Sequence, residues 1–147
     1  MKKFFFALMC LILPSACRAT EVAAAPNPDD SSTTEEVPAA KKVKGSMREI
    51  SVAELHKTKD QVRILVDVRT TGEFAGGYVP GAINIPMSEV DRRLSEFGEP
   101  GDEVHLVCRS GARSGTIAKK LKKLGYNTVN IQGGTMAWVR AGYPVEK

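Results

Sequence analysis

The segment from Val104 to Gly125 constrains the fold most, because an apolar run, a glycine-rich loop and a helical pattern follow one another within it. Val104, Leu106 and Val107 form a short apolar run with β-branched residues, which is typical of a strand buried inside an α/β protein. The run stops at Cys108, where residues that favour turns begin. The sequence therefore predicts a buried strand with a cysteine at its carboxyl end.

The loop after this cysteine is rich in glycine and serine from Arg109 to Gly115, so we expect it to form neither a strand nor a stable helix. A helix should follow, since apolar residues recur there at helical spacing: Ile117, Ala118, Leu121 and Leu124. Gly125 is typical of the position just beyond the end of a helix. The backbone N–H groups of such a loop, at the start of a helix, form a cradle for anions.

The thiol of Cys108 should be reactive in this setting. A free cysteine has a pKa of about 8.5, and helix N-termini and nearby arginines lower that pKa by roughly one unit or more. Arg109 and Arg113 lie on either side of the loop, so we expect Cys108 to be largely ionised and to attack an anionic electrophile. The alternative is a buried structural cysteine, which is the commoner fate of an isolated thiol but leaves both arginines without a role.

Three separated motifs resemble those of the single-domain rhodaneses, a family of sulfurtransferases. CRSGARS, from Cys108 to Ser114, is similar to the active-site loop of that family. DVRTTGEFAGGYVPGAINIP, from Asp67 to Pro86, is similar to its upstream signature, and GGTMAWVRAGYPV, from Gly133 to Val145, to its closing segment. One position departs from the pattern, because Gly77-Tyr78 stands where the family usually has Gly-His. We expect this change to alter packing under the loop and not the chemistry.

The resemblance implies transfer of a sulfane sulfur from a small anionic donor, such as thiosulfate, to cyanide or a thiol, through a persulfide on Cys108. It implies no metal or other cofactor. The residues expected to bind substrate are those of the loop: Arg109, Ser110, Gly111, Ala112 and Arg113. Supporting roles are expected for Asp67, Arg69 and Ser114. We favour an ion pair between Asp67 and Arg69 over direct catalysis by these two residues. The alternative partner of Arg69 is Glu73, four residues further on.

Alternating strand and helix patterns agree with the fold that the resemblance implies, an α/β three-layer sandwich with a mostly parallel five-stranded sheet and helices on both faces. Besides the central strand, strands are expected at residues 48–50, 62–68, 82–85 and 128–131. Helices are expected at residues 51–56, 71–75, 88–97 and 135–141, with Trp138 in the core. The resulting domain covers residues 46–147, and its strands' carboxyl ends are where ligands of such sheets bind.

The N-terminal region differs in composition from this domain. Residues 1–19 combine two lysines, a short apolar stretch and small residues, which predicts a secretory signal peptide and an exported, periplasmic or envelope protein. Two cleavage sites are open: one after Ala19, and a lipoprotein-type site before Cys17, which would then carry a lipid that tethers the chain to a membrane. Residues 20–45 are polar and proline-rich, as in a disordered linker.

Other classes of function fit less well. The formal net charge of +4 is too small to indicate nucleic-acid binding, and His56 and His105 show no spacing typical of metal ligands. Cysteine phosphatases and arsenate reductases of the same fold need an arginine six residues after the cysteine, where this chain has Ser114. A module that only carries a persulfide to a protein partner, itself unidentified, remains open, and an apolar patch at the loop mouth would favour it.

Overall fold

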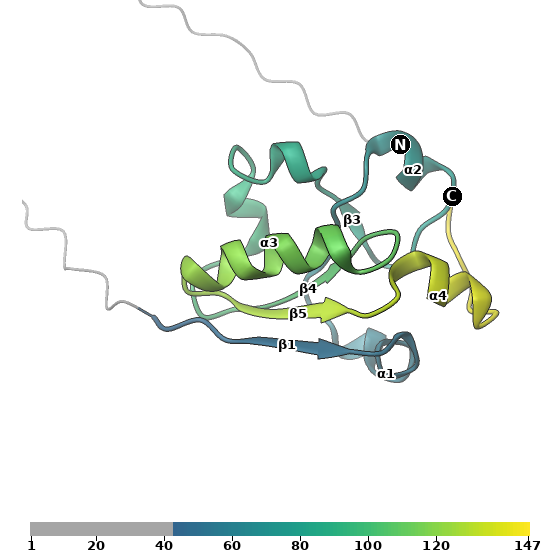
Figure 1. Ribbon diagram of the computed structural model, residues 1–147, viewed down its shortest axis with the longest axis horizontal. Coiled ribbons are helices and arrows are strands. Elements are labelled where there is room, and N and C mark those ends of the chain that lie inside the picture. The colour runs from purple at the N-terminus through teal and green to yellow at the C-terminus, as the bar shows by residue number, and fades with distance from the viewer. Residues whose placement is uncertain (1–42) are drawn as a thin grey trace, which may run out of the picture. The chain divides into compact units, whose positions relative to one another are not determined.

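The computed structural model describes residues 43–147, which form an α/β domain (Figure 1). The predicted signal peptide at residues 1–19, Cys17 within it, and linker residues 20–42 lie outside the described residues and stay predictions. Five strands form one sheet in the order β1-β5-β4-β2-β3, and all of its neighbours pair in parallel. The strands are β1 (Met47–Ile50), β2 (Leu65–Asp67), β3 (Ile83–Asn84), β4 (Glu103–Val107) and β5 (Asn127–Ile131).

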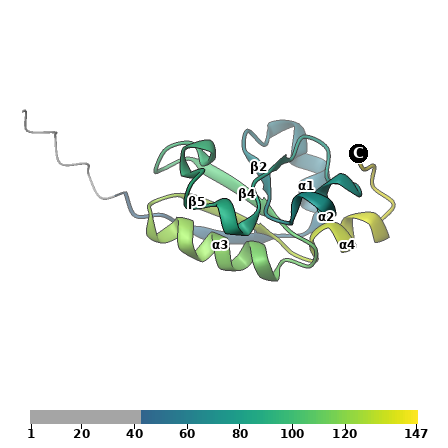
Figure 2. The same ribbon diagram turned by 90° about the horizontal axis from the view of Figure 1, so that it is seen from above.

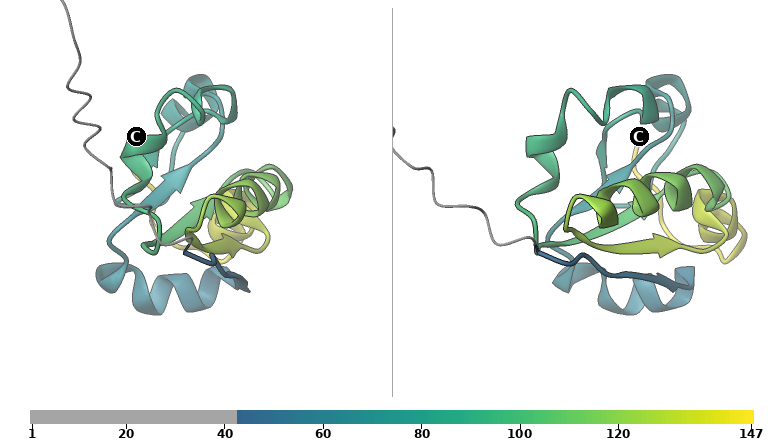
Figure 3. Two further views of the ribbon diagram at one scale, coloured as in Figure 1. Left: turned by 90° about the vertical axis from the view of Figure 1, so that its left-hand side faces the viewer. Right: turned by 60° about the vertical axis from the view of Figure 1, so that its left-hand side comes forward.

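Helical elements connect the strands and cover both faces of the sheet, as Figures 2 and 3 show. The α-helices are α1 (Val52–Thr58), α2 (Thr71–Ala75), α3 (Ala112–Lys123) and α4 (Gly134–Arg140). Three short 3₁₀ turns complete the set: η1 (Lys59–Gln61), η2 (Met87–Glu89) and η3 (Leu94–Phe97). The expected three-layer α/β arrangement with a five-stranded sheet is therefore confirmed.

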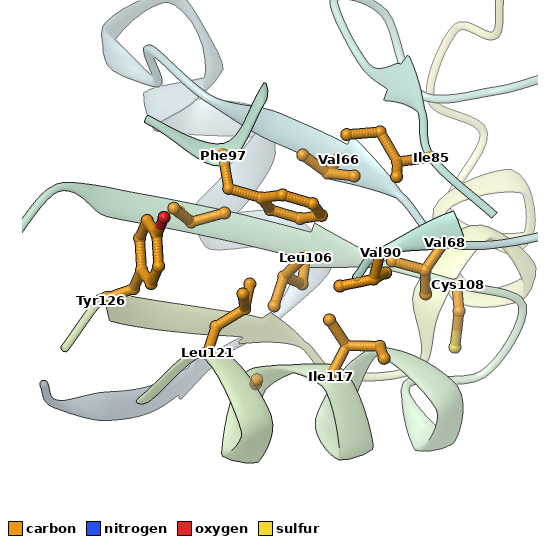
Figure 4. Packing of buried hydrophobic residues seen from close by; sticks show 12 residues of the cluster. Val66, Val68, Ile85, Val90, Phe97, Leu106, Cys108, Ile117, Leu121 and Tyr126 are labelled. Atoms are coloured by element: carbon orange, nitrogen blue, oxygen red, sulfur yellow. The ribbon is translucent and has the colours of Figure 1, made fainter. Parts of the chain in front are cut away.

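Each face of the sheet has its own apolar core. On one face, Ile117 and Leu121 of α3 pack with Phe97 of η3 and with Leu106 of β4 (Figure 4). On the other face, α1 and α4 supply the buried residues, among them the fully buried Trp138 expected from the sequence. Apolar residues of the central strand β4 belong to both cores, as required of a strand covered on both sides. This double burial fixes the position of the residue that follows β4.

One predicted helix is wrong, because residues 88–97 form the turns η2 and η3 and not one α-helix. The apolar residues still face the core, with Val90 and Phe97 fully buried. The chain is interrupted at Arg93, whose guanidinium donates a hydrogen bond of 3.1 Å to the backbone oxygen of Asn84 at the end of β3. At Arg93 the backbone leaves the helical region, with φ of −113° and ψ of 29°, so the two turns do not join into one helix.

The predicted strand at residues 62–68 is also longer than the strand observed. Val62 still belongs to the end of η1, where its N–H donates to the carbonyl of Lys59, and only Leu65–Asp67 pair in the sheet. The remaining helices and strands begin and end within about two residues of the predicted ranges, apart from the start of α3, which forms part of the site.

Candidate active site

Cys108 lies at the carboxyl edge of the sheet, directly after β4, and is 1% exposed. It belongs to the same core cluster as Val68 and Ile117, and its side chain points to the side of the sheet that α3 covers (Figure 4). The following loop is shorter than expected, because α3 already begins at Ala112 and not near Ile117. Gly111 makes this early start possible: its φ of 98° is left-handed, and its carbonyl accepts the N–H of Gly115 at 2.9 Å. Cys108 therefore lies beside the N-terminus of a twelve-residue helix.

Hydrogen bonds converge on the sulfur atom. The N–H of Gly111 lies 3.1 Å from Cys108 Sγ, and the hydroxyl of Ser114 lies 3.4 Å from it. Burial raises the pKa of the Cys108 thiol. Hydrogen bonds from the Ser114 side chain and from the backbone N–H groups of Ser114, Ser110 and Gly111 lower this pKa by a larger amount, so the net shift is downward. The loop thus favours the thiolate, as the sequence predicted.

The predicted role of the arginines in this activation stays a prediction, because one of them is engaged by another side chain. Arg113 is held by Glu73 of α2, with Nη1 to Oε2 at 2.8 Å and Nη2 to Oε1 at 2.7 Å. The hydrogen bond to Glu73 is the largest cause of the raised pKa of Arg113, and attraction to Cys108 is a smaller one. The guanidinium of Arg109 is exposed and forms no ion pair with any described residue. The lowering of the thiol pKa comes from hydrogen bonds that together outweigh the opposing effect of burial.

Glu73 is itself fixed by the first turn of α2. Its N–H and carboxylate form a capping box with Thr70, and Arg113 completes the carboxylate's set of donors. The hydrogen bond from Arg113 is the main reason why the pKa of Glu73 falls from 4.5 to about 2. Because this folded-state pKa is depressed, the pair stabilises the protein above about pH 4.5, and its contribution is lost as the pH falls toward about 2.

The other supporting residues form two buried groups. The side chain of Asp67 is fully buried and pairs with Arg69 at 2.7 Å, which confirms the predicted ion pair. Ser114, also fully buried, has one hydroxyl proton, for which Asn130 Oδ1 at 2.7 Å competes with Cys108 Sγ at 3.4 Å. The amide of Asn130 donates in turn to Glu49 at 2.9 Å. Ser114 therefore joins the sulfur to a polar chain that crosses β5 and ends on β1.

Sequence reasoning missed Glu73 as the partner of Arg113 and missed Asn130 altogether. Glu73 carries a local signal, since Thr70 followed three residues later by glutamate is the pattern of a capping box. Asn130 is a polar residue in a buried strand, between Val129 and Ile131. Such a residue needs a hydrogen-bond partner, which is a general reason to inspect it.

No metal site accompanies these groups: within residues 43–147, no three side chains of His, Cys, Asp or Glu are placed to hold an ion. Over the same residues, no helix has the length and apolar character needed to cross a membrane.

Ser114→Ala should raise the pKa of the Cys108 thiol, because the hydroxyl is the strongest of the hydrogen bonds that lower it. The rate of alkylation by iodoacetamide, measured from pH 5 to 10, reports this pKa. Ser114→Thr keeps the hydroxyl and serves as the matched control. An alkylation profile of Ser114→Ala that overlays the wild-type profile would show that the backbone N–H groups alone set the pKa.

Known proteins are similar to this chain over most of the described residues. The rhodanese-like domain family matches residues 51–141. A protein of Allochromatium vinosum named "Sulfurtransferase" is 43% identical over 83 residues, which cover 56% of this chain and 77% of the relative. The "Putative sulfurtransferase YtwF" of Bacillus subtilis is 37% identical over 94 residues, which cover 63% of this chain and 90% of the relative.

Solved structures agree with the sequence matches. A rhodanese-related protein from Thermoplasma volcanium superimposes with a TM-score of 0.62 at 32% identity, covering 67% of this chain and 97% of that one. A protein from Staphylococcus saprophyticus gives a TM-score of 0.61 at 33% identity, covering 69% and 100%. The fold and the loop thus define an α/β domain with a buried cysteine at the carboxyl edge of its sheet. The chain belongs to the rhodanese-like domain family.

Proposed function

We propose that the protein is a sulfurtransferase that moves a sulfane sulfur from a donor such as thiosulfate to a thiophilic acceptor. The observation that carries this proposal is the set of hydrogen bonds from Gly111 and Ser114 to Cys108 Sγ, which favour the thiolate at the carboxyl edge of the sheet. Membership of the rhodanese-like family and relatives named as sulfurtransferases support it.

The chemistry needs two steps and one nucleophile. In the first step, the Cys108 thiolate attacks the outer sulfur of thiosulfate, the sulfur–sulfur bond of the donor breaks, and sulfite leaves with the bonding electron pair. In the second step, cyanide or a thiolate attacks the outer sulfur of the resulting persulfide and returns the electron pair to Cys108. The N–H groups of the loop stabilise negative charge on the sulfur in both steps.

Intact mass spectrometry tests the proposal directly. The protein is incubated with thiosulfate, separated from the donor and weighed before and after addition of cyanide. We expect the mass to rise by one sulfur atom and to return to its starting value with release of thiocyanate. A protein that stays unmodified under these conditions would overturn transfer from thiosulfate.

The phosphatase alternative gains no support from the site. Ser114 stands where that chemistry needs an arginine, and its hydroxyl points inward at Cys108 and Asn130. Arg113, the nearest arginine on α3, is engaged by Glu73. We therefore expect no hydrolysis of aryl phosphates by the wild-type protein.

Glu73→Gln should increase the affinity for anionic donors. In the wild type, the Glu73 carboxylate occupies both terminal nitrogens of Arg113, so a sulfonate must compete with it for that guanidinium. We expect KM for thiosulfate to fall about two- to five-fold, with kcat changed less, because one partly exposed ion pair is weakened. Steady-state kinetics with thiosulfate and cyanide provide the measurement. A rise in KM would show instead that Glu73 holds Arg113 in the position that binds the donor.

For the whole chain we propose export, supported by the apolar leader in residues 1–19, with anchoring through Cys17 as the alternative to cleavage after Ala19. The intact mass of the mature protein from its host distinguishes a lipid-bearing Cys17 from a free N-terminus at Thr20.

A further inference from the structure

The hydroxyl of Ser114 is surrounded by more hydrogen-bond acceptors than it can serve. Ser114 Oγ lies 2.7 Å from Asn130 Oδ1, 3.2 Å from the carbonyl oxygen of Gly111 and 3.4 Å from Cys108 Sγ. A hydroxyl carries one proton to donate, and both oxygens can only accept, so they compete with the sulfur for that proton. The contact with Asn130 is the shortest, which makes Asn130 the strongest competitor.

The orientation of the Asn130 amide is set by Glu49, its neighbour on β1. Asn130 Nδ2 donates to Glu49 Oε1 at 2.9 Å, and Gln132 Nε2 donates to Glu49 Oε2 at 2.8 Å. The hydrogen bonds from Gln132 and Asn130 lower the pKa of Glu49, so its carboxylate stays ionised and can only accept. The NH₂ group of Asn130 must therefore face Glu49, and its oxygen must face Ser114.

The end of this chain of contacts that touches the sulfur is shielded from water. Ser114 is fully buried, Asn130 is 4% exposed and Cys108 is 1% exposed, whereas Glu49 is exposed. Bulk water does not replace a hydrogen bond that is lost in such a buried position. A change in the orientation of the Asn130 amide therefore acts on the Ser114 proton.

Charged groups act on the two ends of the chain and not on its middle. Arg113 of α3 attracts Cys108, but its guanidinium is engaged by Glu73 of α2. Lys119, also on α3, lies close enough to Glu49 to lower the pKa of that carboxylate slightly. The hydroxyl and the amide between these ends are neutral, so they act on the sulfur through hydrogen bonds alone.

We infer that Asn130 is a positioning residue: it accepts the Ser114 hydroxyl while Cys108 is a neutral thiol, and it gives this donor up to the sulfur when the thiol ionises. In the thiol form, Sγ–H donates to Ser114 Oγ, and Ser114 donates to Asn130 Oδ1. When the thiol proton leaves to water, the Ser114 hydroxyl turns and donates to the thiolate, with its own proton still bonded to Oγ. Asn130 Oδ1 loses its donor in this step, so Asn130 limits the ionisation that the loop favours.

The inference rests on the proposed function, in which the thiolate attacks the donor, but alkylation by iodoacetamide from pH 5 to 10 tests it without sulfur transfer. Asn130→Leu removes the competing oxygen and keeps a side chain of similar size in the buried strand. The Ser114 proton is then available to the thiolate, so we expect alkylation at pH 6 to be about two- to four-fold faster than in the wild type. The plateau rate at high pH should not rise, because access to the sulfur is unchanged.

Glu49→Lys should have the same effect by turning the amide around. An ammonium group only donates, so Asn130 must present its oxygen to residue 49 and its NH₂ group to Ser114. Ser114 then accepts from Asn130 and donates to the sulfur, and we again expect alkylation at pH 6 to be about two- to four-fold faster, with no rise in the plateau. Residue 49 is exposed, so this variant decides the question if circular dichroism shows that Asn130→Leu does not fold.

Two controls separate the hydroxyl from the effects of charge and packing. Glu99→Lys makes the same charge reversal at an exposed residue before the start of β4, at the opposite edge of the sheet from Cys108, and should be alkylated at the wild-type rate. In a Ser114→Ala background the hydroxyl is missing, so Asn130→Leu and Glu49→Lys should each change the rate at pH 6 by less than about 1.5-fold.

Four results would overturn the inference: a wild-type or slower rate at pH 6 in either variant that folds, a raised plateau, an increase of the same size in the Ser114→Ala background, or an equal increase in Glu99→Lys. Failure of the proposed function looks different, because the mass of Cys108 would then not increase with thiosulfate, whatever the alkylation profiles show. Normal loading with unchanged alkylation profiles would contradict only the role of Asn130.

Discussion

Replacing Cys108 with alanine should abolish persulfide formation completely while lowering the free energy of unfolding by only about 1 kcal/mol. All covalent chemistry in the proposed reaction passes through Cys108 Sγ, and it is the one cysteine among the described residues. The structural cost is small because only one sulfur atom is removed from a packed position. The mass after incubation with thiosulfate reports the chemistry, and urea denaturation reports the stability.

Cys108→Ser is the control that separates sulfur chemistry from packing. Its hydroxyl retains an acceptor for the N–H of Gly111 and the hydroxyl of Ser114, but it is not expected to be ionised or to form a persulfide. Sulfur transfer by either variant at more than a trace of the wild-type rate would contradict the assignment of Cys108 as nucleophile.

The position of Cys108 depends on close backbone contacts around it. The N–H of Thr135 donates to the carbonyl of Cys108 at 2.8 Å, and the N–H of Met136 donates to that of Arg109 at 3.0 Å. This approach requires glycine at Gly134, where an added Cβ would lie 2.1 Å from the Cys108 carbonyl oxygen. The starts of α3 and α4 together fix the loop, and a glycine lies at each start: Gly111 directly before α3 and Gly134 as the first residue of α4.

Sequence patterns predicted the order of strand, cysteine loop and helix correctly, although not the early start of α3 at Ala112, because the signals are local and agree with one another. The apolar run before Cys108 is buried on both sides, and the glycines mark the turns. The capping patterns at Ser51 and Thr70 also mark the starts of α1 and α2 where the structure has them.

The errors arose where contacts between distant residues decide the outcome. Periodicity in residues 88–97 identifies the buried side chains but not the non-helical backbone at Arg93, whose guanidinium contacts the distant backbone oxygen of Asn84. Likewise, Arg113 lies five residues from Cys108, but Glu73, forty residues away in the chain, determines where its guanidinium points. Charge proximity in sequence is therefore a poor guide to which charge acts on the thiol.

Arg69→Ala should destabilise the fold by about 3–5 kcal/mol, because it leaves the fully buried carboxylate of Asp67 without its partner. Arg69 contributes its Nε and Nη2 atoms to this carboxylate, and Nη2 also donates to the carbonyl of Gly77 at 2.9 Å. The side chain thus joins the end of β2 to the chain after α2, which forms one wall of a groove beside the active site.

Arg92→Ala provides the contrast, since Arg92 is 75% exposed and its contact with Glu89 is 3.4 Å long. We expect that variant to lose less than about 1 kcal/mol in urea denaturation, because water already screens the pair. Replacing both members of the buried pair, as Asp67→Asn with Arg69→Met, should recover part of the loss by removing the uncompensated charge. If Arg69→Ala were no less stable than Arg92→Ala, the ion pair between Asp67 and Arg69 would not hold this edge of the sheet together, and its role would be confined to shaping the groove.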